Sequence, residues 1–421
     1  MKSSNSLVKL IFISVLSIFL TSNFSFSQKE EESIQQKFAG QVDIKDVIKN
    51  IFHSKSRLKD TINILGSPQT LSVSILPGIS YNPANGVVFG VSASLSKFFG
   101  STKNTKISAL SAAVSVTTES QLKISVQSII NTSRNEWSLQ GDWRFWKYSQ
   151  NTYGLGTQTV PGDAQQMEFN FIRFNENVLK KLIPNCYIGL GYSLEAYSDI
   201  TTLDSSDAFL YPNYNNTYSA QHGYDSLKYI SSGFVLNLDY DSRDNPINPY
   251  KGLYADVKYY NYKKFFGSSQ DWQNLQYEFR AFKSITKDHS YIMAFWTLGT
   301  IAVGNNSGPY MSLPAVGWDK YNTTGRGYIQ GRFRGNDYMY AGFENRIRLT
   351  KNGLFGMVLF VNVESASNNS QNIKLLDFIE PAGGIGIRIK FDKYSRTNLC
   401  VDYGIGRYGS SGVFMNIGEF F

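Results

Sequence analysis

The sequence predicts an all-β fold, a 16-stranded antiparallel transmembrane β-barrel with a short amphipathic helix ahead of it. From about Leu71 onward, runs of roughly 9 to 15 residues alternate apolar with polar or small side chains, as barrel strands do. The chain is rich in aromatic residues, with 27 Tyr and 29 Phe, and it has only 11 Pro. No window of about 18 residues beyond the first 27 is continuously apolar, which excludes helical membrane spans.

The first 27 residues have the pattern of a secretory signal peptide. A positively charged start precedes an apolar run over residues 10–20, which is too short to cross a bilayer, and small residues frame a cleavage site before Gln28. We therefore expect three segments: a signal peptide at 1–27, a short periplasmic segment at 28–71 and the transmembrane β-barrel at 72–421.

The stretch "DIKDVIKNIF" predicts one amphipathic helix within the periplasmic segment. Asp43 is placed to cap it, and apolar residues recur at helical spacing, namely Ile44, Val47, Ile48, Ile51 and Phe52. Such a helix can pack against the barrel, lie at the inner membrane interface or dock a partner.

The alternation within the strands indicates which face meets lipid. In "GFVLNLDYDSRDN", Leu236 and Leu238 point one way while Asn237 and Asp239 point the other. Apolar residues outside and polar residues inside is the arrangement typical of membrane barrels. Sixteen such runs begin near Ser72, Val87, Lys106, Leu122, Trp137, Met167, Cys186, Tyr229, Gly252, Trp272, Tyr291, Tyr338, Gly353, Ile379, Thr397 and Gly412. The longest connections, 150–166, 199–228 and 305–337, are predicted to be extracellular.

Charge and cysteine content exclude other classes. The net charge of +8 is spread along an exported chain, so we expect no nucleic-acid partner. By strand parity, Cys186 and Cys400 face opposite sides of the wall, which makes a disulfide between them improbable.

The three histidines do not indicate an enzyme. His53, His222 and His289 fall in the helix, a loop and a turn, without a serine or second histidine at useful spacing. We expect no catalytic residues, no metal site and no cofactor.

Four stretches follow one another in a meaningful order: "DYDSRDNPINPYKG", "GRGY", "GFENR" and "FMNIGEFF". Together they resemble the BamA/TamA-type bacterial surface antigen barrels. That superfamily contains the central subunit of the β-barrel assembly machinery and the two-partner secretion translocators.

The resemblance implies an inward-folded sixth extracellular loop. Arg326, Gly327 and Tyr328 match the motif at the tip of that loop, whose arginine meets acidic groups on the inner wall. Glu344 has the parity to be one partner. Where the family usually has an aspartate this chain has Asn362, so one expected partner is a neutral amide, and Glu364 on the same face is a possible substitute.

The following "GRFRG" has no assigned role. Arg332 and Arg334 are expected to line the inner cavity, to reach lipid phosphates or to lie in a solvated loop.

Two further motifs predict local features of the chain. A rigid periplasmic hairpin is predicted around Asp241, Arg243, Asp244, Pro249 and Gly252. The end of the chain resembles the C-terminal assembly signal of outer-membrane barrels, carried here by Asn416, Gly418 and Phe421.

The resemblance also suggests a function. The 44 residues from Gln28 to Leu71 are too few for a POTRA domain, so the chain resembles the short, barrel-only branch. The expected function is outer-membrane protein or lipid insertion, or translocation, through a seam between the first and last strands. Pro77 and Gly78 would soften the first strand at that seam, or they are an ordinary irregularity of an edge strand. The alternatives are a passive pore or structural barrel, and an adaptor that recruits a periplasmic partner through the helix.

The expected location is the bacterial outer membrane, with both termini in the periplasm. The expected partners are outer-membrane lipids and lipopolysaccharide, the barrel assembly machinery during the chain's own insertion, and client outer-membrane proteins.

Overall fold

The computed structural model describes residues 40–51, 71–82, 86–101, 104–202 and 213–421. The predicted signal peptide and most of the segment 28–71, including Phe52 and His53 of the predicted helix region, lie outside these residues.

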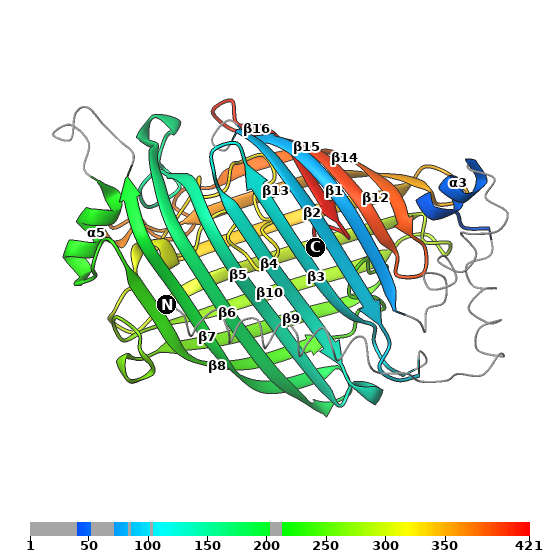
Figure 1. The fold of residues 1–421 in the computed structure, drawn as a ribbon, viewed down its shortest axis with the longest axis horizontal. Coiled ribbons are helices and arrows are strands. Elements are labelled where there is room, and N and C mark those ends of the chain that lie inside the picture. The colour runs from blue at the N-terminus through cyan, green and yellow to red at the C-terminus, as the bar shows by residue number, and fades with distance from the viewer. Residues whose placement is uncertain (1–39, 52–70, 83–85, 102–103, 203–212) are drawn as a thin grey trace.

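One antiparallel sheet of sixteen strands in sequence order forms the molecule (Figure 1). This confirms the all-β antiparallel class. The strands are β1 Ser72–Asn82, β2 Gly86–Lys97, β3 Ser108–Thr117, β4 Leu122–Asn131, β5 Trp137–Thr152, β6 Gln165–Ile183, β7 Cys186–Thr202, β8 Tyr229–Asp241, β9 Gly252–Tyr262, β10 Trp272–Ser284, β11 Tyr291–Val303, β12 Tyr338–Arg348, β13 Phe355–Ala366, β14 Glu380–Asp392, β15 Thr397–Gly406 and β16 Ser411–Ile417.

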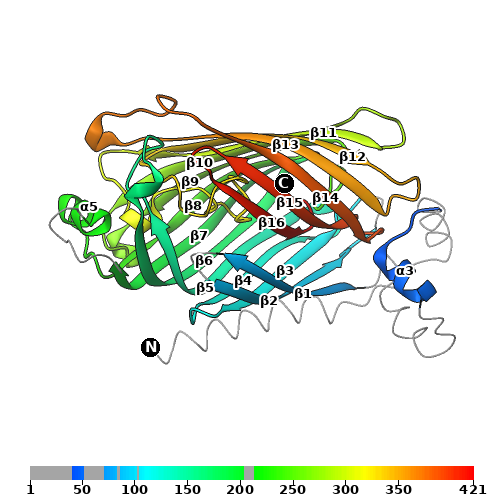
Figure 2. The ribbon, with the colours of Figure 1, turned by 90° about the horizontal axis from the view of Figure 1, so that it is seen from above.

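The alternation seen in the sequence separates the two faces of the sheet. On β8, Leu236 and Leu238 are 45% and 51% exposed, whereas Asn237 and Asp239 between them are buried. The sheet curls around an interior (Figures 1 and 2). The burial of the polar residues and the exposure of the apolar ones place the polar face inside and the apolar face outside. Cys186 is partly exposed, Cys400 is buried, and both are free, in agreement with their predicted opposite parity.

The two ends of the curled sheet differ. Helix α5 (Tyr214–His222) marks the end that carries the long connections 153–164, 203–228, 304–337 and 367–379, which we call the loop end. Helix α3 (Ile44–Ile51) marks the opposite end, where the connections are short turns, which we call the turn end (Figure 1). Helix α5 was not expected from the sequence; its N-terminus is capped by Asn213, whose side chain accepts a hydrogen bond from the main-chain nitrogen of Asn216.

The first and last strands differ from the others. Pairings join each strand to its neighbour from β1 through β16, and among the described residues none joins β16 back to β1. β1 has 11 residues and keeps its register with β2 through Pro77, whereas β16 has only 7.

No described helix combines the length and the apolar character that a bilayer crossing requires.

Candidate functional site

The connection 304–337 folds into the interior and is held partly by its own arginine. Arg334 is fully buried, and its Nη1 donates to the main-chain oxygens of Tyr310, Met311 and Leu313 at 3.0, 3.0 and 2.9 Å. All three bonds come from one nitrogen that carries two hydrogens, so the three carbonyls share these donors and are held close together in one tight turn. The first half of the loop is thus wrapped around Arg334.

Arg332 joins this loop to the connection between β5 and β6. Its Nη1 and Nη2 donate to Oγ1 and the main-chain oxygen of Thr159, at 2.9 and 2.5 Å. The "GRFRG" arginines therefore lie buried in protein and contact other loop segments, not lipid phosphates.

An aromatic surface on the inner wall receives the loop. Trp318 of the loop lies 5.3 Å, centroid to centroid, from both Trp146 and Phe171, and its Nε1 donates to Oε1 of Gln150 at 2.9 Å. Such contacts bury large apolar area and fix ring orientation. The loop is therefore seated on β5 and β6.

Arg326 lies at the centre of the site. Its Nη2 is 2.5 Å from Oε1 of Glu344 on β12, and its Nη1 is 2.5 Å from Oδ2 of Asp402 on β15. Its guanidinium also lies over two rings, 4.0 Å from the centroid of Phe360 and 4.5 Å from that of Phe420. One arginine thus bridges two carboxylates from non-adjacent strands, and aromatic rings shield both bonds from water.

Asn362 contacts the same arginine in a way that an aspartate could not. Its Nδ2 donates to the main-chain oxygen of Arg326 at 3.0 Å. A carboxylate has no proton to donate there, so the amide suits this geometry. Glu364 lies beside Gly325 instead, where an added Cβ would come within 2.4 Å of its Oε1. The second acidic partner of Arg326 is therefore Asp402, which the sequence analysis did not single out.

The ion pairs continue away from Arg326 in both directions. Glu344 also accepts from Nε of Arg346 at 2.7 Å, and Arg388 pairs with Asp402 and, through Nε at 2.8 Å, with Glu419. Cations and anions thus alternate along one buried chain: Arg346, Glu344, Arg326, Asp402, Arg388 and Glu419. The three charges of each sign balance, which limits the desolvation cost of placing them in the interior. We call these six residues the lock.

The end of the chain lies inside the sheet, in contact with the lock. Gly418 has φ +105°, and its nitrogen donates to the main-chain oxygen of Asn398 at 2.8 Å, where the chain leaves β16 and turns inward. Phe420 and Phe421 are buried, and the Phe421 ring stacks on Trp296 at 5.2 Å.

Two polar contacts fix this tail. The main-chain oxygen of Phe421 accepts from Nη2 of Arg346 at 2.7 Å, and Asn416 Nδ2 donates to the main-chain oxygen of Glu419 at 2.8 Å. Burial tends to raise the pKa of Glu419, but the positive charges of Arg388 and Arg346 outweigh it and hold that pKa below its ordinary value. Glu419 therefore stays ionised as a member of the lock.

Gly327 and Tyr328 pack the loop tip against β14 and β15. Gly327 has φ +121°, and a Cβ there would lie 2.7 Å from the Cβ of Ala382 and 3.0 Å from the carbonyl carbon of Ile405. Only glycine fits such a close approach at positive φ. The Tyr328 hydroxyl donates to the main-chain oxygen of Pro381 at 2.7 Å, and burial raises its pKa to about 12, so that it keeps the proton.

At the turn end, the predicted hairpin motif forms the connection between β8 and β9. Asp241 pairs with Nε of Arg243 at 2.9 Å, and Pro249 lies in the turn that follows. Gly252 has φ +111°, and a Cβ there would be 2.4 Å from the main-chain oxygen of Ser242, which explains the glycine.

The same turn reaches across to a distant one. Asp244 accepts from the nitrogen of Tyr250 at 2.9 Å and pairs with Nη1 of Arg396 at 2.6 Å. Asn245 Nδ2 donates to the main-chain oxygen of Ser395 at 3.3 Å. The β8–β9 turn is thus attached to the β14–β15 turn, a contact that the local sequence pattern did not indicate.

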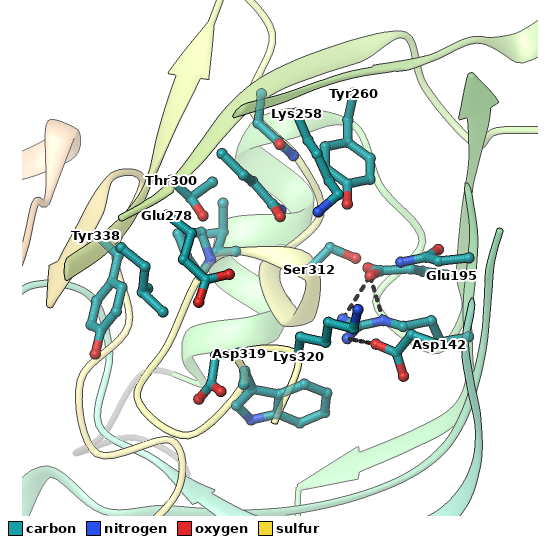
Figure 3. Close-up of a pocket in the computed structure, with 18 of the residues that line it drawn as sticks. Asp142, Glu195, Lys258, Tyr260, Glu278, Thr300, Ser312, Asp319, Lys320 and Tyr338 are labelled. Carbon is teal, nitrogen blue, oxygen red and sulfur yellow. Dashed lines mark hydrogen bonds and ion pairs between the residues drawn. The ribbon is translucent and has the colours of Figure 1, made fainter. Parts of the chain in front are cut away.

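Between these two ends lies a polar cavity of about 160 Å³. Figure 3 shows Asp142, Glu195 and Lys258 of the wall around a common space with Ser312 and Lys320 of the loop. The acids are paired, since Arg173 lies 3.3 Å from Asp142 and 2.7 Å from Glu195. Among the described residues, no cluster of His, Cys, Asp and Glu has the geometry of a metal site.

Comparisons with known proteins point to one family. The model of the Omp85 superfamily domain matches residues 63–408. No curated protein sequence is significantly similar to the chain.

Three solved structures share the fold. BamA from Haemophilus ducreyi lacking POTRA domains 1–3 is 14% identical with a TM-score of 0.52, over 83% of this chain and 70% of that one. CdiB from Acinetobacter baumannii is 12% identical with a TM-score of 0.50, over 86% and 67%. CdiB from Escherichia coli is 7% identical with a TM-score of 0.50, over 82% of this chain and 62% of that one, less than two thirds of its length.

Proposed function

Because the chain belongs to the Omp85 superfamily of outer-membrane β-barrels, we propose that it inserts outer-membrane proteins, or translocates them, through a seam between β1 and β16. In this proposal the sheet closes into a barrel at that seam, the loop end faces outward from the cell and the turn end faces the periplasm. Both termini would then be periplasmic. The clients would be unfolded outer-membrane proteins, in a membrane of phospholipid and lipopolysaccharide.

The observation that carries the proposal is the shortness of β16. The ladder runs from β1 to β16 with no described pairing between the two, and the tail after Ile417 turns inward where it would otherwise extend the strand. Unpaired backbone groups in hydrocarbon cost several kcal/mol each. An incoming strand that paired with such an edge would relieve this cost, which is recognition by β-augmentation.

Because the interior is occupied, a client protein is more easily passed through the wall of the barrel than through its lumen. The connection 304–337 fills the loop end around Arg334 and Trp318, and the β8–β9 turn crosses the turn end to Ser395 and Arg396. A passive pore would need a continuous aqueous route past both segments. Opening of the seam between β1 and β16 requires neither of these two segments to move.

We assign the lock a supporting role in this mechanism. Arg326 joins β12 to β15, and Arg388 joins β14 to the tail that follows β16. The last strands thereby form one stiff unit, so that the seam can open by movement of the β1 edge.

A cross-link across the seam tests the proposal. Ile75→Cys and Ile417→Cys, in a Cys186→Ser background, place two thiols on the outer face of β1 and β16. Oxidation is expected to slow insertion of a second barrel into liposomes, and reduction to restore it. The matched control is Ile387→Cys with Val401→Cys, which are register partners in the β14–β15 ladder and should have no effect when oxidised.

The alternatives give different results in the same liposomes. Unchanged insertion by the cross-linked seam variant, together with steady single-channel currents, would replace the proposal with a passive pore. Deletion of residues 40–55 that abolishes co-purification of a periplasmic protein, without affecting insertion, would support the adaptor function.

A further inference from the structure

Helix α3 begins at a reciprocal capping arrangement that sets its position. The nitrogen of Asp43 donates to Oδ2 of Asp46 at 3.1 Å, and the nitrogen of Asp46 donates to Oδ1 of Asp43 at 3.0 Å. Just before it, the nitrogen of Val42 donates to the main-chain oxygen of Asn352 in the β12–β13 turn at 2.9 Å. The start of the helix is therefore tied to the turn end of the sheet.

The polar side of α3 is used for docking on the β14–β15 turn. Lys45 Nζ lies 2.6 Å from Oδ2 of Asp392, and Asp46 Oδ2 lies 2.8 Å from Nζ of Lys393. Asp43 Oδ2 accepts from the main-chain nitrogen of Lys393 at 3.1 Å. Three contacts from one helical turn hold the helix against this hairpin.

The helix lies against the end of β14, a strand whose outer face is apolar. Ile385 and Ile387 alternate along the outer face of this strand, and Ile387 is 55% exposed. A bulge between Lys390 and Asp392 interrupts this alternation, and Phe391 at the bulge is only 9% exposed, with Nζ of Lys45 5.7 Å from its ring centroid. Figure 2 shows α3 beside the end of β14. The helix therefore covers Phe391, at the end of a strand whose outer face carries Ile385 and Ile387.

The described residues leave the apolar side of α3 largely uncovered. Ile48 is 50% exposed, and Ile44 and Val47, which share its face, are only partly buried. In a soluble helix this side would pack on the protein. Here the helix adjoins the end of β14, whose outer face would meet lipid in an outer-membrane barrel.

We propose that α3 is an interfacial helix, with Ile44, Val47 and Ile48 inserted into the acyl-chain boundary of the adjoining phospholipid leaflet. Helices of this kind lie in the plane of the interface with their apolar side buried and their charged side outside it. The ion pairs to Asp392 and Lys393 fix the rotation of α3 so that this apolar side faces the membrane. The helix thus anchors the β14–β15 hairpin to the bilayer surface.

A spin label at position 48 reads the surroundings directly. Ile48→Cys, in a Cys186→Ser background, is labelled with a nitroxide after reconstitution in phosphatidylethanolamine and phosphatidylglycerol vesicles. Collision rates are then measured with oxygen, which enriches in lipid, and with a nickel chelate, which stays in water. Ile387→Cys is the membrane control, and Lys251→Cys, exposed in the β8–β9 turn, is the aqueous control at the same end.

The label at 48 is expected to resemble that at 387, with oxygen collisions favoured several-fold over the aqueous control. Collision ratios at position 48 equal to those at position 251 would overturn the proposal. A second contrary result would be a label that both reagents reach in vesicles but neither reaches in native outer membrane, because a protein would then cover this side of the helix. The inference depends on membrane location but not on insertion activity, so an inactive barrel with a lipid-exposed label would contradict only the proposed function.

Discussion

Replacement of Arg326 by alanine is the most direct perturbation of the lock. The substitution removes two charge-assisted hydrogen bonds, to Glu344 and Asp402, each worth roughly 1.5–3 kcal/mol. Both carboxylates keep a second arginine, Arg346 or Arg388, which limits the loss, although three carboxylates then share two arginines. We therefore expect the low end of the range, about 3 kcal/mol, which is an increase of roughly 100-fold in the undocked fraction of the loop.

Thiol labelling measures that fraction. Val316 is fully buried in the same loop, and Val316→Cys is close to isosteric, so its reaction with a maleimide reports loop opening. In a Cys186→Ser background, Arg326→Ala should accelerate labelling about 100-fold while the heat-modifiable mobility of the folded barrel persists. Arg407→Ala is the matched control, because that arginine is half exposed and pairs only at the edge of the site.

A labelling rate within about twofold of the parent would show that Arg326 does not hold the loop, and our reasoning on the lock would be wrong. Exchanging the charges, Arg326→Glu with Glu344→Arg, is a second check. The double variant regains the attraction between positions 326 and 344 and the balance of charge, but its new carboxylate faces Asp402 and its new guanidinium lies beside Arg346. It should therefore label more slowly than either single variant and still faster than the parent. Full recovery of the parent labelling rate in the double variant would indicate an isolated pair instead of an extended chain of charges.

Three other substitutions use the same reporter. Asn362→Asp replaces the donor to the Arg326 carbonyl with an acceptor and should raise labelling about tenfold or more, since an unmade buried bond costs about 1–3 kcal/mol; parent-like labelling would mean that this bond is unimportant. Gly327→Ala puts a methyl 2.7 Å from the Cβ of Ala382, so the loop should undock as fully as in Arg326→Ala, and a docked variant would place the loop tip elsewhere. Phe421→Ala empties a buried site against Trp296 and should lower the temperature at which the barrel loses its folded mobility, by a loss of roughly 3 kcal/mol; an unchanged temperature would mean that the tail is not packed.

The strands were predictable because each carries its own signal. Alternation of apolar and polar residues is local, and the observed strands begin within about two residues of the positions expected from it. Glu344 was placed by the same parity, since inward residues on a strand are two apart. Helix α5 was missed because its residues have no apolar face to mark it.

The partners across the interior could not be predicted in the same way. Asp402 has the same inward parity as Cys400, so the sequence contained a weak signal for it, but nothing local places it next to Arg326, 76 residues away. The attachment of Asn245 to Ser395 spans 150 residues. Such contacts depend on how far the sheet curls and where its loops return. The alternation of apolar and polar residues along a strand does not specify either.

The inward turn at Gly418 has a consequence for the timing of biogenesis. If the aromatic end of the chain is read by assembly machinery, as the resemblance implies, it can be read only before Phe420 and Phe421 enter the interior. Folding would then bury the signal by which the assembly machinery recognised the chain. A finished barrel would not compete with newly exported chains, and receptor turnover would follow from the same step that completes the last strand.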